Sequence, residues 1–363
     1  MLFGKKRYTA IDIGSHNITV ADIKEAGDGN LRVVNIAQKS VPYDTVVNGI
    51  IQDTSVVSNR LQEIFSESGI KPGTILTTVS NDSLIVRNVT LPKMSEKELA
   101  NVIRWEIEDY IPFSAEYARL DYKILNTTEE DMEILLIAVK EDVVKSFEEP
   151  YDILNLKPNV INIQPMALLS ILEYQNELDS PVAILEVGAA GSRIVIGDQN
   201  NVYLSRSFST GGYEFTESII ETMGHNYENA EQRKKEVGLR SEVGSDEAEE
   251  SVEPIDIEDL GSSTGSSGTM LPLAYNIADE LNRSLDFFAR KKVEQGVSKI
   301  YLTGGSSKLQ GLKELLESEI NHDIERLNPF DNFLTDFEII EEDSPHYSVV
   351  LGLAASEVLA DES

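Results

Sequence analysis

The sequence of 363 residues contains no cysteine, which excludes disulfides and thiolate metal sites from this chain. The absence also fits a reducing cytoplasmic setting, where disulfides rarely persist. Histidine is scarce too: the four histidines are scattered without the spacing of metal ligands, which argues against histidine-based metal catalysis. The length nevertheless allows a large core and suggests two domains or one bilobed body.

Positive charge is the second deficit. The chain has 31 Lys and Arg residues against 63 Asp and Glu residues, for a formal net charge of −32. Such a surface repels nucleic acid and anionic lipid, so we expect neither as the main partner. A basic partner remains compatible with this composition.

Long apolar runs are missing as well. No stretch approaches the roughly 18 apolar residues that span a membrane, and "MLFGKKRY" at the start lacks the apolar core of a signal peptide. We therefore expect a soluble protein that is not exported.

One segment, residues 241–269, differs from the rest in composition. It contains many acids, no Lys or Arg, and a final Gly/Ser run. Because it buries too little apolar surface to offset its ordering entropy, we predict a disordered acidic loop inside a folded domain. A solvated insertion without a role is the simpler interpretation, and a docking tail for a basic partner is the alternative.

The remaining sequence alternates between strand-like and helix-like patterns. β-branched or alternating composition predicts strands at 8–14, 17–24, 31–39, 75–80, 83–91, 118–125, 133–139, 182–187, 192–198, 201–206 and 299–303. Apolar residues at helical spacing predict helices at 54–67, 95–111 and around 277–288, and the second starts with a capping-box pair, Ser95 and Glu98. We interpret the apolar stripes of these helices as core packing in an α/β protein.

Two stretches half a chain apart repeat one pattern. When "AIDIGSHNITVADI" (10–23) is placed on "AILEVGAAGSRIVIGD" (183–198), Asp12 falls on Glu186 and the following strands stay in register. This is an internal duplication. Two such hairpins across a cleft form a clamp, in which turn N–H groups point at phosphate oxygens while Asp12 and Glu186 hold a hydrated Mg²⁺. Each hairpin alone is a weak motif, because a lone Asp-x-Gly turn is usually only a turn.

A third motif is "SKIYLTGGSSKLQGL", residues 298–312, which consists of an apolar strand, a Gly-Gly turn and a helix start. Gly304 and Gly305 let a base or ribose lie against bare backbone, and Ser306 can cap the helix. On its own, a plain strand-to-helix turn explains this motif equally well.

Together and in this order, the three motifs resemble those of the actin, Hsp70 and sugar-kinase superfamily of ATP-binding proteins. The stretches "YIPFSAEYARLDY", "STGGYEFTESI", "AEQRKKEVGL", "IADELNRSLDFF" and "LTGGSSKLQGL" are similar to the PilM family, the actin-like proteins of type IV pilus assembly, which are related to the cell-division protein FtsA. The resemblance implies a bilobed actin-like ATPase fold with an inserted small α+β subdomain. It divides the chain into 1–79, the first half of the fold; 80–160, the inserted subdomain; and 161–363, the second half with the acidic insertion.

The resemblance also implies which residues hold ATP and Mg²⁺. It assigns the catalytic and metal positions to Asp12 and Glu186. The cofactor-binding positions are Gly14, Ser15, His16, Asn17, Gly188, Ala189, Ala190, Gly191, Ser192, Gly211, Gly212, Glu231, Lys234, Gly304, Gly305 and Ser306. For Glu231 and Lys234, an exposed helix face with ion pairs of little energetic weight is the alternative.

Two departures from the family pattern affect the expected activity. The family's first hairpin often ends in a lysine where this chain has Thr19, which removes one cationic phosphate contact. The second acid is usually Asp, whereas Glu186 is one methylene longer, and an attacking water needs tight positioning. We therefore expect nucleotide binding with slow or no hydrolysis, in a scaffold whose lobes close on ATP.

The partner implied by the resemblance is the N-terminal cytoplasmic tail of a PilN-like inner-membrane protein, which would recruit this chain to the membrane. Self-association is also compatible with the family. Basic residues near the membrane suit the acidic surface, and the groove is expected beside the inserted subdomain, at 95–111 and 111–113. Trp105 could be an exposed anchor there, although covering the subdomain core is the interpretation we favour.

Other protein classes share parts of this pattern. A sugar or acetate kinase shares the fold but needs a catalytic base between the lobes, and no such residue stands out. An FtsA-like filament protein usually ends in a basic amphipathic helix, whereas this chain ends "SEVLADES". An Hsp70-like chaperone would continue into a further domain, and an L-type protein of type II secretion would need a transmembrane helix.

Overall fold

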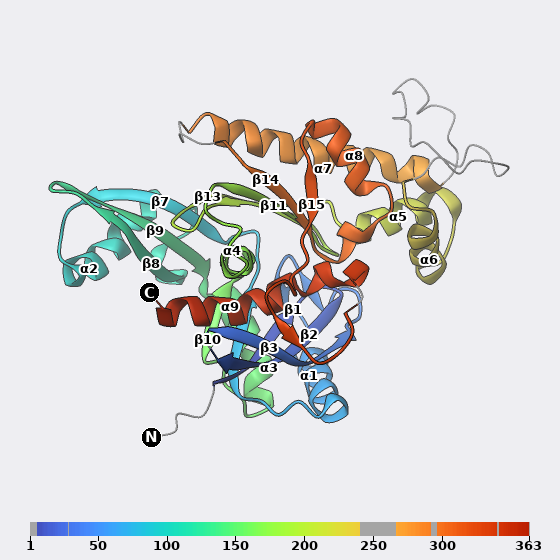
Figure 1. Cartoon of the computed structure of the whole chain (residues 1–363), viewed down its shortest axis with the longest axis horizontal. Helices are drawn as coiled ribbons and strands as arrows, with labels where there is room; N and C mark the ends of the chain where they lie inside the picture. The colour runs from blue at the N-terminus through green and yellow to red at the C-terminus, as the bar shows by residue number, and fades with distance from the viewer. Residues whose placement is uncertain (1–5, 28, 240–265, 292–295, 340, 363) are drawn as a thin grey trace.

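The computed structural model describes residues 6–27, 29–239, 266–291, 296–339 and 341–362 (Figure 1). Two large sheets lie in two lobes, and a smaller sheet projects beside them. All statements on the fold below concern these residues.

The first sheet has the strand order β10-β6-β1-β2-β3-β16. Its strands are β1 (Arg7–Ile13), β2 (Asn17–Gly27), β3 (Asn30–Ser40), β6 (Thr74–Val79), β10 (Val160–Ile163) and β16 (Leu334–Thr335). β1 and β2 form an antiparallel hairpin, and β6 runs parallel to β1. A two-stranded ribbon of β4 (Val46–Val47) and β5 (Ile50–Ile51) follows β3 in the chain.

The second sheet repeats this arrangement with the order β13-β12-β11-β14-β15. Its strands are β11 (Val182–Val187), β12 (Ser192–Gly197), β13 (Val202–Phe208), β14 (Lys299–Thr303) and β15 (Ile324–Arg326). β11 and β12 form the antiparallel hairpin, and β14 runs parallel to β11 as β6 does to β1. The duplication predicted from the two hairpins is therefore confirmed at the level of whole sheets.

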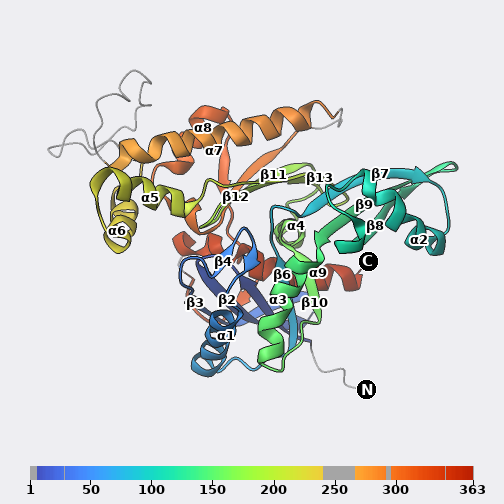
Figure 2. The same cartoon turned by 180° about the vertical axis from the view of Figure 1, so that it is seen from behind.

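Helices bury both faces of each large sheet. α1 (Thr54–Ser68) and α3 (Glu141–Ile153) pack on the outer face of the first sheet, while α5 (Gly212–Met223), α6 (Tyr227–Val237), α7 (Ser266–Ala289) and α8 (Leu312–Ile320) pack on the outer face of the second. α4 (Gln164–Tyr174) and α9 (Ser348–Glu362) lie against each other between the sheets, as Figures 1 and 2 show. The inner core thus joins the two lobes.

Strand periodicity decides which side chains face the interior between the lobes. In β1, Ala10 packs in the core shared by both lobes, while Ile11 packs on the outer face under α1. In β11, Ile184 packs in the shared core and Leu185 on the outer face. Because alternate side chains of a strand share a face, the even-numbered carboxylates that follow point between the lobes.

The small sheet has the order β7-β9-β8 and carries α2 (Glu96–Glu106) on one face. Its strands are β7 (Ile85–Pro92), β8 (Ala118–Thr127) and β9 (Asp131–Lys140). The predicted capping box is present, since the Ser95 hydroxyl accepts from the Glu98 N–H and the Glu98 carboxylate accepts from the Ser95 N–H. The buried stripe is Leu99, Ile103, Ile107 and Ile111, as the spacing predicts.

β7, α2, β8 and β9 all lie within residues 85–140, inside the predicted subdomain 80–160, whose bounds stay a prediction. α3 packs on α1 and β5 in the first lobe, and β10 pairs with β6 of the first sheet. The predicted second half likewise returns to the first lobe at its end, where β16 pairs with β3 and α9 packs on β1.

The long predicted strands are confirmed within a few residues, and the short ones β4, β5, β10, β15 and β16 were not foreseen. The predicted disordered insertion ended at Thr269, and this boundary is wrong because α7 begins at Ser266 and buries Ser266 and Ser267. The rest of that insertion, 241–265, lies outside the described residues. None of the helices described here has an apolar stretch that could cross a membrane.

Candidate functional site: the cleft between the two hairpins

Two tight turns close the hairpins in the same way. The Gly14 N–H donates to the Asn17 carbonyl at 3.0 Å, and the Gly188 N–H donates to the Gly191 carbonyl at 2.9 Å. Two residues before the glycine that opens each turn, a carboxylate, Asp12 or Glu186, lies on the inner face of its sheet. The fold therefore places the two repeated motifs opposite each other.

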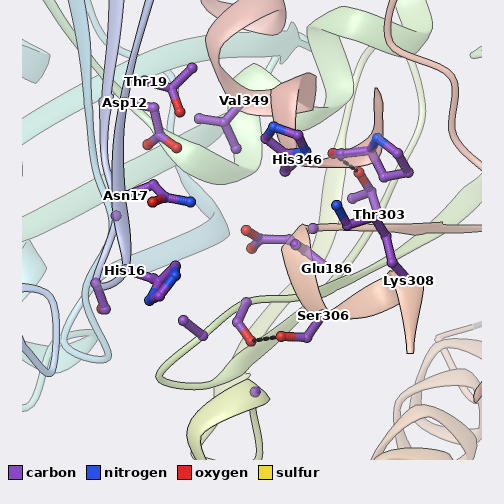
Figure 3. Close-up of a pocket in the computed structure, with 18 of the residues that line it drawn as sticks. Asp12, His16, Asn17, Thr19, Glu186, Thr303, Ser306, Lys308, His346 and Val349 are labelled. Carbon is purple, nitrogen blue, oxygen red and sulfur yellow. Dashed lines mark hydrogen bonds between the residues drawn. The ribbon is translucent and has the colours of Figure 1, made fainter. Parts of the chain in front are cut away.

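A cavity of about 260 Å³ lies between the turns. Figure 3 shows Asp12, His16 and Asn17 on one wall and Glu186 on the other. The predicted residues that line the cavity are Asp12, Gly14, Ser15, His16, Asn17, Glu186, Gly188, Ala189, Gly212, Glu231, Lys234, Gly304, Gly305 and Ser306. Segments that are far apart in the chain thus meet in one cleft.

The remaining predicted positions do not line this cavity. Ala190, Gly191 and Ser192 line a second cavity of about 190 Å³ that shares both carboxylates with the first. Gly211 lines neither cavity, and its role is to let the chain pass close to the backbone of Gly191.

Both carboxylates lie in buried surroundings that disfavour their charged forms. Burial raises the pKa of Asp12 to about 6, against a hydrogen bond from the Thr78 hydroxyl at 3.3 Å. Burial also raises the pKa of Glu186 to about 7; the charge of Arg193 lowers it, and the charge of Asp12 raises it further. The Gln164 amide donates to Glu186 at 2.8 Å.

This pair fits a hydrated divalent cation. Mg²⁺ prefers hard oxygen ligands, keeps several waters and needs only one or two carboxylates besides phosphate oxygens. Among the described residues, no three His, Asp or Glu side chains gather into a self-sufficient metal site. Asp12 and Glu186 are therefore the residues that would hold Mg²⁺, which would neutralise the charge of bound phosphates.

The third motif forms the floor of the cleft. Gly304 has a φ of 90°, and a Cβ there would lie 2.5 Å from the Val187 carbonyl oxygen, so this position requires glycine. A Cβ on Gly305 would meet open space, which leaves bare backbone for a ligand. The predicted capping role of Ser306 is wrong: its hydroxyl donates to the Gly188 carbonyl at 2.9 Å, and α8 begins only at Leu312.

Glu231 and Lys234 are partly or fully buried, so the alternative of an exposed ion-pair face is wrong for them. The Lys234 ammonium donates to the Gly212 carbonyl and the Thr216 hydroxyl, each at 2.9 Å, and pairs with Glu231 at 2.6 Å. Burial tends to raise the pKa of Glu231, but the charge and hydrogen bond of Lys234 bring it down to about 2. An ammonium has three N–H donors, and these three partners use all of them. Lys234 therefore stabilises the wall of the cleft through contacts within the protein.

Several lining residues were missed by sequence reasoning. Tyr213 follows the Gly-Gly pair of α5, and its hydroxyl donates to the Ser15 carbonyl at 2.8 Å, which links the second lobe to the first turn. Gln164 starts α4 and reaches Glu186, although nothing in its local pattern marks it. Arg193 had a signal, because the duplication places it where the first hairpin has Thr19.

In the predicted partner-binding region, residues 95–113, the exposure of the tryptophan differs from expectation. Trp105 is 83% exposed on α2, so the favoured core role is wrong. Tyr117, which leads into β8, is 65% exposed. Ile111 is buried and Phe113 packs against the core of the small sheet, so the loop 111–113 contributes to packing.

Comparison with known proteins agrees with this architecture. The chain is 19% identical over 352 residues to the cell division protein FtsA of Bacillus subtilis (strain 168), covering 89% of this chain and 78% of FtsA. The MreB5 structure of Spiroplasma citri bound to AMPPNP has a TM-score of 0.53 at 14% identity, covering 98% of this chain and 97% of that one. The chain has the actin-like bilobed fold, as predicted.

A nearer structural relative is a PilM-PilN type IV pilus biogenesis complex, with a TM-score of 0.81 at 25% identity, covering 97% of this chain and 98% of that one. The family described as type IV pilus assembly protein PilM matches residues 10–357, which is nearly the whole chain. Because this family matches nearly the whole chain, and because the structure has the two lobes described above, the chain belongs to the PilM family of type IV pilus assembly proteins.

Proposed function

We propose that this chain is a nucleotide-dependent scaffold of type IV pilus or competence-pilus assembly, located in the cytoplasm. It binds Mg-ATP between the two hairpins, hydrolyses it slowly or not at all, and holds the N-terminal tail of a PilN-like inner-membrane protein. That partner would bring it to the cytoplasmic face of the inner membrane.

One observation carries the nucleotide part: two identically closed turns face each other across a 260 Å³ cavity with a carboxylate at each turn. Backbone N–H groups in such turns bind phosphate oxygens without needing a particular side chain. The Ala-Ala-Gly sequence of the second turn is therefore no obstacle to binding. Bare backbone at Gly305 adds room for a ribose or base.

The partner part rests on the PilM-PilN relative and on exposed aromatic surface. Trp105 has 83% of its surface exposed on a helix that otherwise packs well, and large aromatic side chains are frequent anchors in protein interfaces. The formal charge of −32 favours a basic peptide through long-range attraction.

Calorimetric titration of Mg-ATP into nucleotide-free protein tests the first part. We expect micromolar binding by the unmodified protein and its loss in Asp12→Ala. Asp323→Ala, which removes an exposed carboxylate far along the chain, is the matched control and should bind as the unmodified protein does. Absence of binding by the unmodified protein would refute the nucleotide-binding proposal.

Titration of a PilN-like tail peptide, with and without nucleotide, tests the second part. Trp105→Ala should weaken peptide binding, whereas Phe287→Ala, which removes a 51% exposed aromatic ring from α7, should leave it unchanged. Equal effects of the two variants would argue against α2 as the docking surface.

A steady release of phosphate at tens of turnovers per second would contradict the scaffold role.

A further inference from the structure

Arg193 is a buried cation that the assigned nucleotide positions do not include. It lies in β12 and is only 5% exposed. In the hairpin register it stands opposite Glu186, where Thr19 stands opposite Asp12 in the first hairpin. The second hairpin therefore carries a cation at the position where the first hairpin has a neutral threonine.

The hydrogen bonds of Arg193 leave part of its guanidinium available. Its Nε donates to Gln164 Oε1 at 3.3 Å, and its two terminal nitrogens donate to the hydroxyls of Ser80 at 3.1 Å and Ser205 at 3.5 Å. All three acceptors are neutral oxygens. A guanidinium has five N–H donors, and a buried cation gains most from a charged acceptor.

The second cavity, of about 190 Å³, brings this guanidinium to the phosphate turns. It is lined by Arg193 together with Asp12, Gly14, Glu186 and Gly188, and the latter four also line the first cavity. The two cavities therefore adjoin each other at the carboxylate pair. A phosphate chain that enters from the first cavity and follows the turns has its terminal group nearest the second.

We propose that Arg193 contacts the terminal phosphate of a bound nucleoside triphosphate and makes the cleft prefer triphosphate over diphosphate. This inference rests on the proposed nucleotide binding. The planar fork of a guanidinium matches two phosphate oxygens, and the terminal phosphate carries the charge that a diphosphate lacks at this position. Mg²⁺ held by Asp12 and Glu186 would reduce the repulsion between these carboxylates and the phosphate.

The experiment compares Arg193→Met with the unmodified, nucleotide-free protein by calorimetric titration. Each is titrated with Mg-ADP and with a non-hydrolysable Mg-ATP analogue. We expect the affinity for the triphosphate analogue to fall by roughly tenfold to a hundredfold, as for a lost charge-assisted hydrogen bond, and the affinity for Mg-ADP to change by less than about threefold. Equal losses for both ligands, or no loss, would overturn the proposal.

Two further variants separate binding from folding. Arg193→Lys keeps the charge but loses the fork, so an intermediate loss confined to the triphosphate is expected even if Arg193→Met unfolds. Arg206→Met, in the adjacent strand, removes an arginine that is paired with Glu280 away from the cleft and should change neither affinity. A thermal melt without nucleotide checks that each variant is folded.

The outcomes distinguish this inference from the function on which it rests. An unmodified protein that binds neither nucleotide refutes both. An unmodified protein that binds both, with a preference that Arg193→Met and Arg193→Lys leave intact, overturns the inference alone. Inorganic phosphate is the remaining probe: if it tightens Mg-ADP binding through Arg193 while triphosphate affinity is insensitive to Arg193, the site holds free phosphate and the terminal-phosphate assignment is wrong.

Discussion

The first and second hairpins have the same backbone geometry but differ in almost every functional side chain. Both turns close with one N–H to carbonyl bond, and both hairpins pair their acid with the residue seven positions later. In the first hairpin the acid is Asp12 opposite a neutral Thr19. In the second it is Glu186 opposite a cationic Arg193.

The strand beside each hairpin supports its acid differently. Thr78, at the end of β6, donates its hydroxyl to Asp12. Its counterpart Thr303, at the end of β14, instead donates to the Pro345 carbonyl at 2.7 Å, and Glu186 receives its hydrogen bond from Gln164. The duplication thus preserves the backbone that a phosphate would contact, while charge and donors have been divided unequally between the halves.

The largest effect should come from Gly304, which follows β14 and lies against Val187 of the second hairpin. Gly304→Ala would place a Cβ 2.5 Å from the Val187 carbonyl oxygen at a φ of 90°. Because both strain and overpacking result, we expect the free energy of unfolding to fall by about 3 kcal/mol. Urea denaturation measures this loss, and Gly305→Ala, whose Cβ meets open space, is the control with a change below about 0.5 kcal/mol. Similar stability of the two variants would show that the second hairpin does not depend on this close approach.

The next effect compares the two acids. Asp12 has one hydrogen bond, from a hydroxyl at 3.3 Å, whereas Glu186 already receives a 2.8 Å amide bond and the field of Arg193. Asp12 is thus the more available metal ligand. We expect Asp12→Asn to weaken Mg-nucleotide binding about a hundredfold and Glu186→Gln about tenfold, or about 2.7 and 1.4 kcal/mol. Titration calorimetry at fixed Mg²⁺ measures both, and the reverse order would overturn this ranking.

The free energy of unfolding should depend on pH differently in the unmodified protein and in variants that replace an acid by its neutral isostere. Burial raises the pKa of Glu186 from 4.5 to about 7, so the nucleotide-free folded state binds this proton more tightly than the unfolded state. Its contribution to stability is therefore largest at low pH and is lost between about pH 4.5 and 7. We expect Glu186→Gln to be about 1–2 kcal/mol more stable than the unmodified protein at pH 8, with little gain near pH 4.5.

Denaturation at pH 4.5 and pH 8 checks this sign. Asp12→Asn should show the same gain in stability over a lower pH range, because the pKa of Asp12 is raised from 3.8 to about 6. A gain of the same size at both pH values would mean that the charge of the carboxylate does not cause it.

The smallest expected effect concerns how each turn is held. The Ser15 carbonyl of the first turn accepts from Tyr213 of the opposite lobe, whereas the Gly188 carbonyl of the second accepts from Ser306 of its own lobe. Tyr213→Phe should cost about 1 kcal/mol in unfolding free energy, the usual value of one hydrogen bond. Tyr227→Phe, on the neighbouring helix, should change it by less than about 0.5 kcal/mol. Equal effects would indicate that the bridge between the lobes contributes nothing.

Sequence patterns predict some features of this structure and not others. The acids and turns of both hairpins were found because they repeat, and the long strands were found because alternation continues over several residues. Strands such as β10 and β15 were missed because three or four residues acquire their conformation from the strands they pair with. Trp105 was misjudged because helical spacing between two buried isoleucines does not determine which way a neighbouring side chain faces.

What the sequence by itself determined is the α/β class, the duplicated hairpins and the two acids, since all of these depend on local pattern and its repetition. Only the tertiary structure decided that Ser306 supports the second turn, that Lys234 is satisfied internally, and that Gln164, Ser80 and Arg193 meet behind Glu186. Each of these contacts joins segments distant in the chain. Their hydrogen-bond partners are set by the packing of two lobes, which no local pattern encodes.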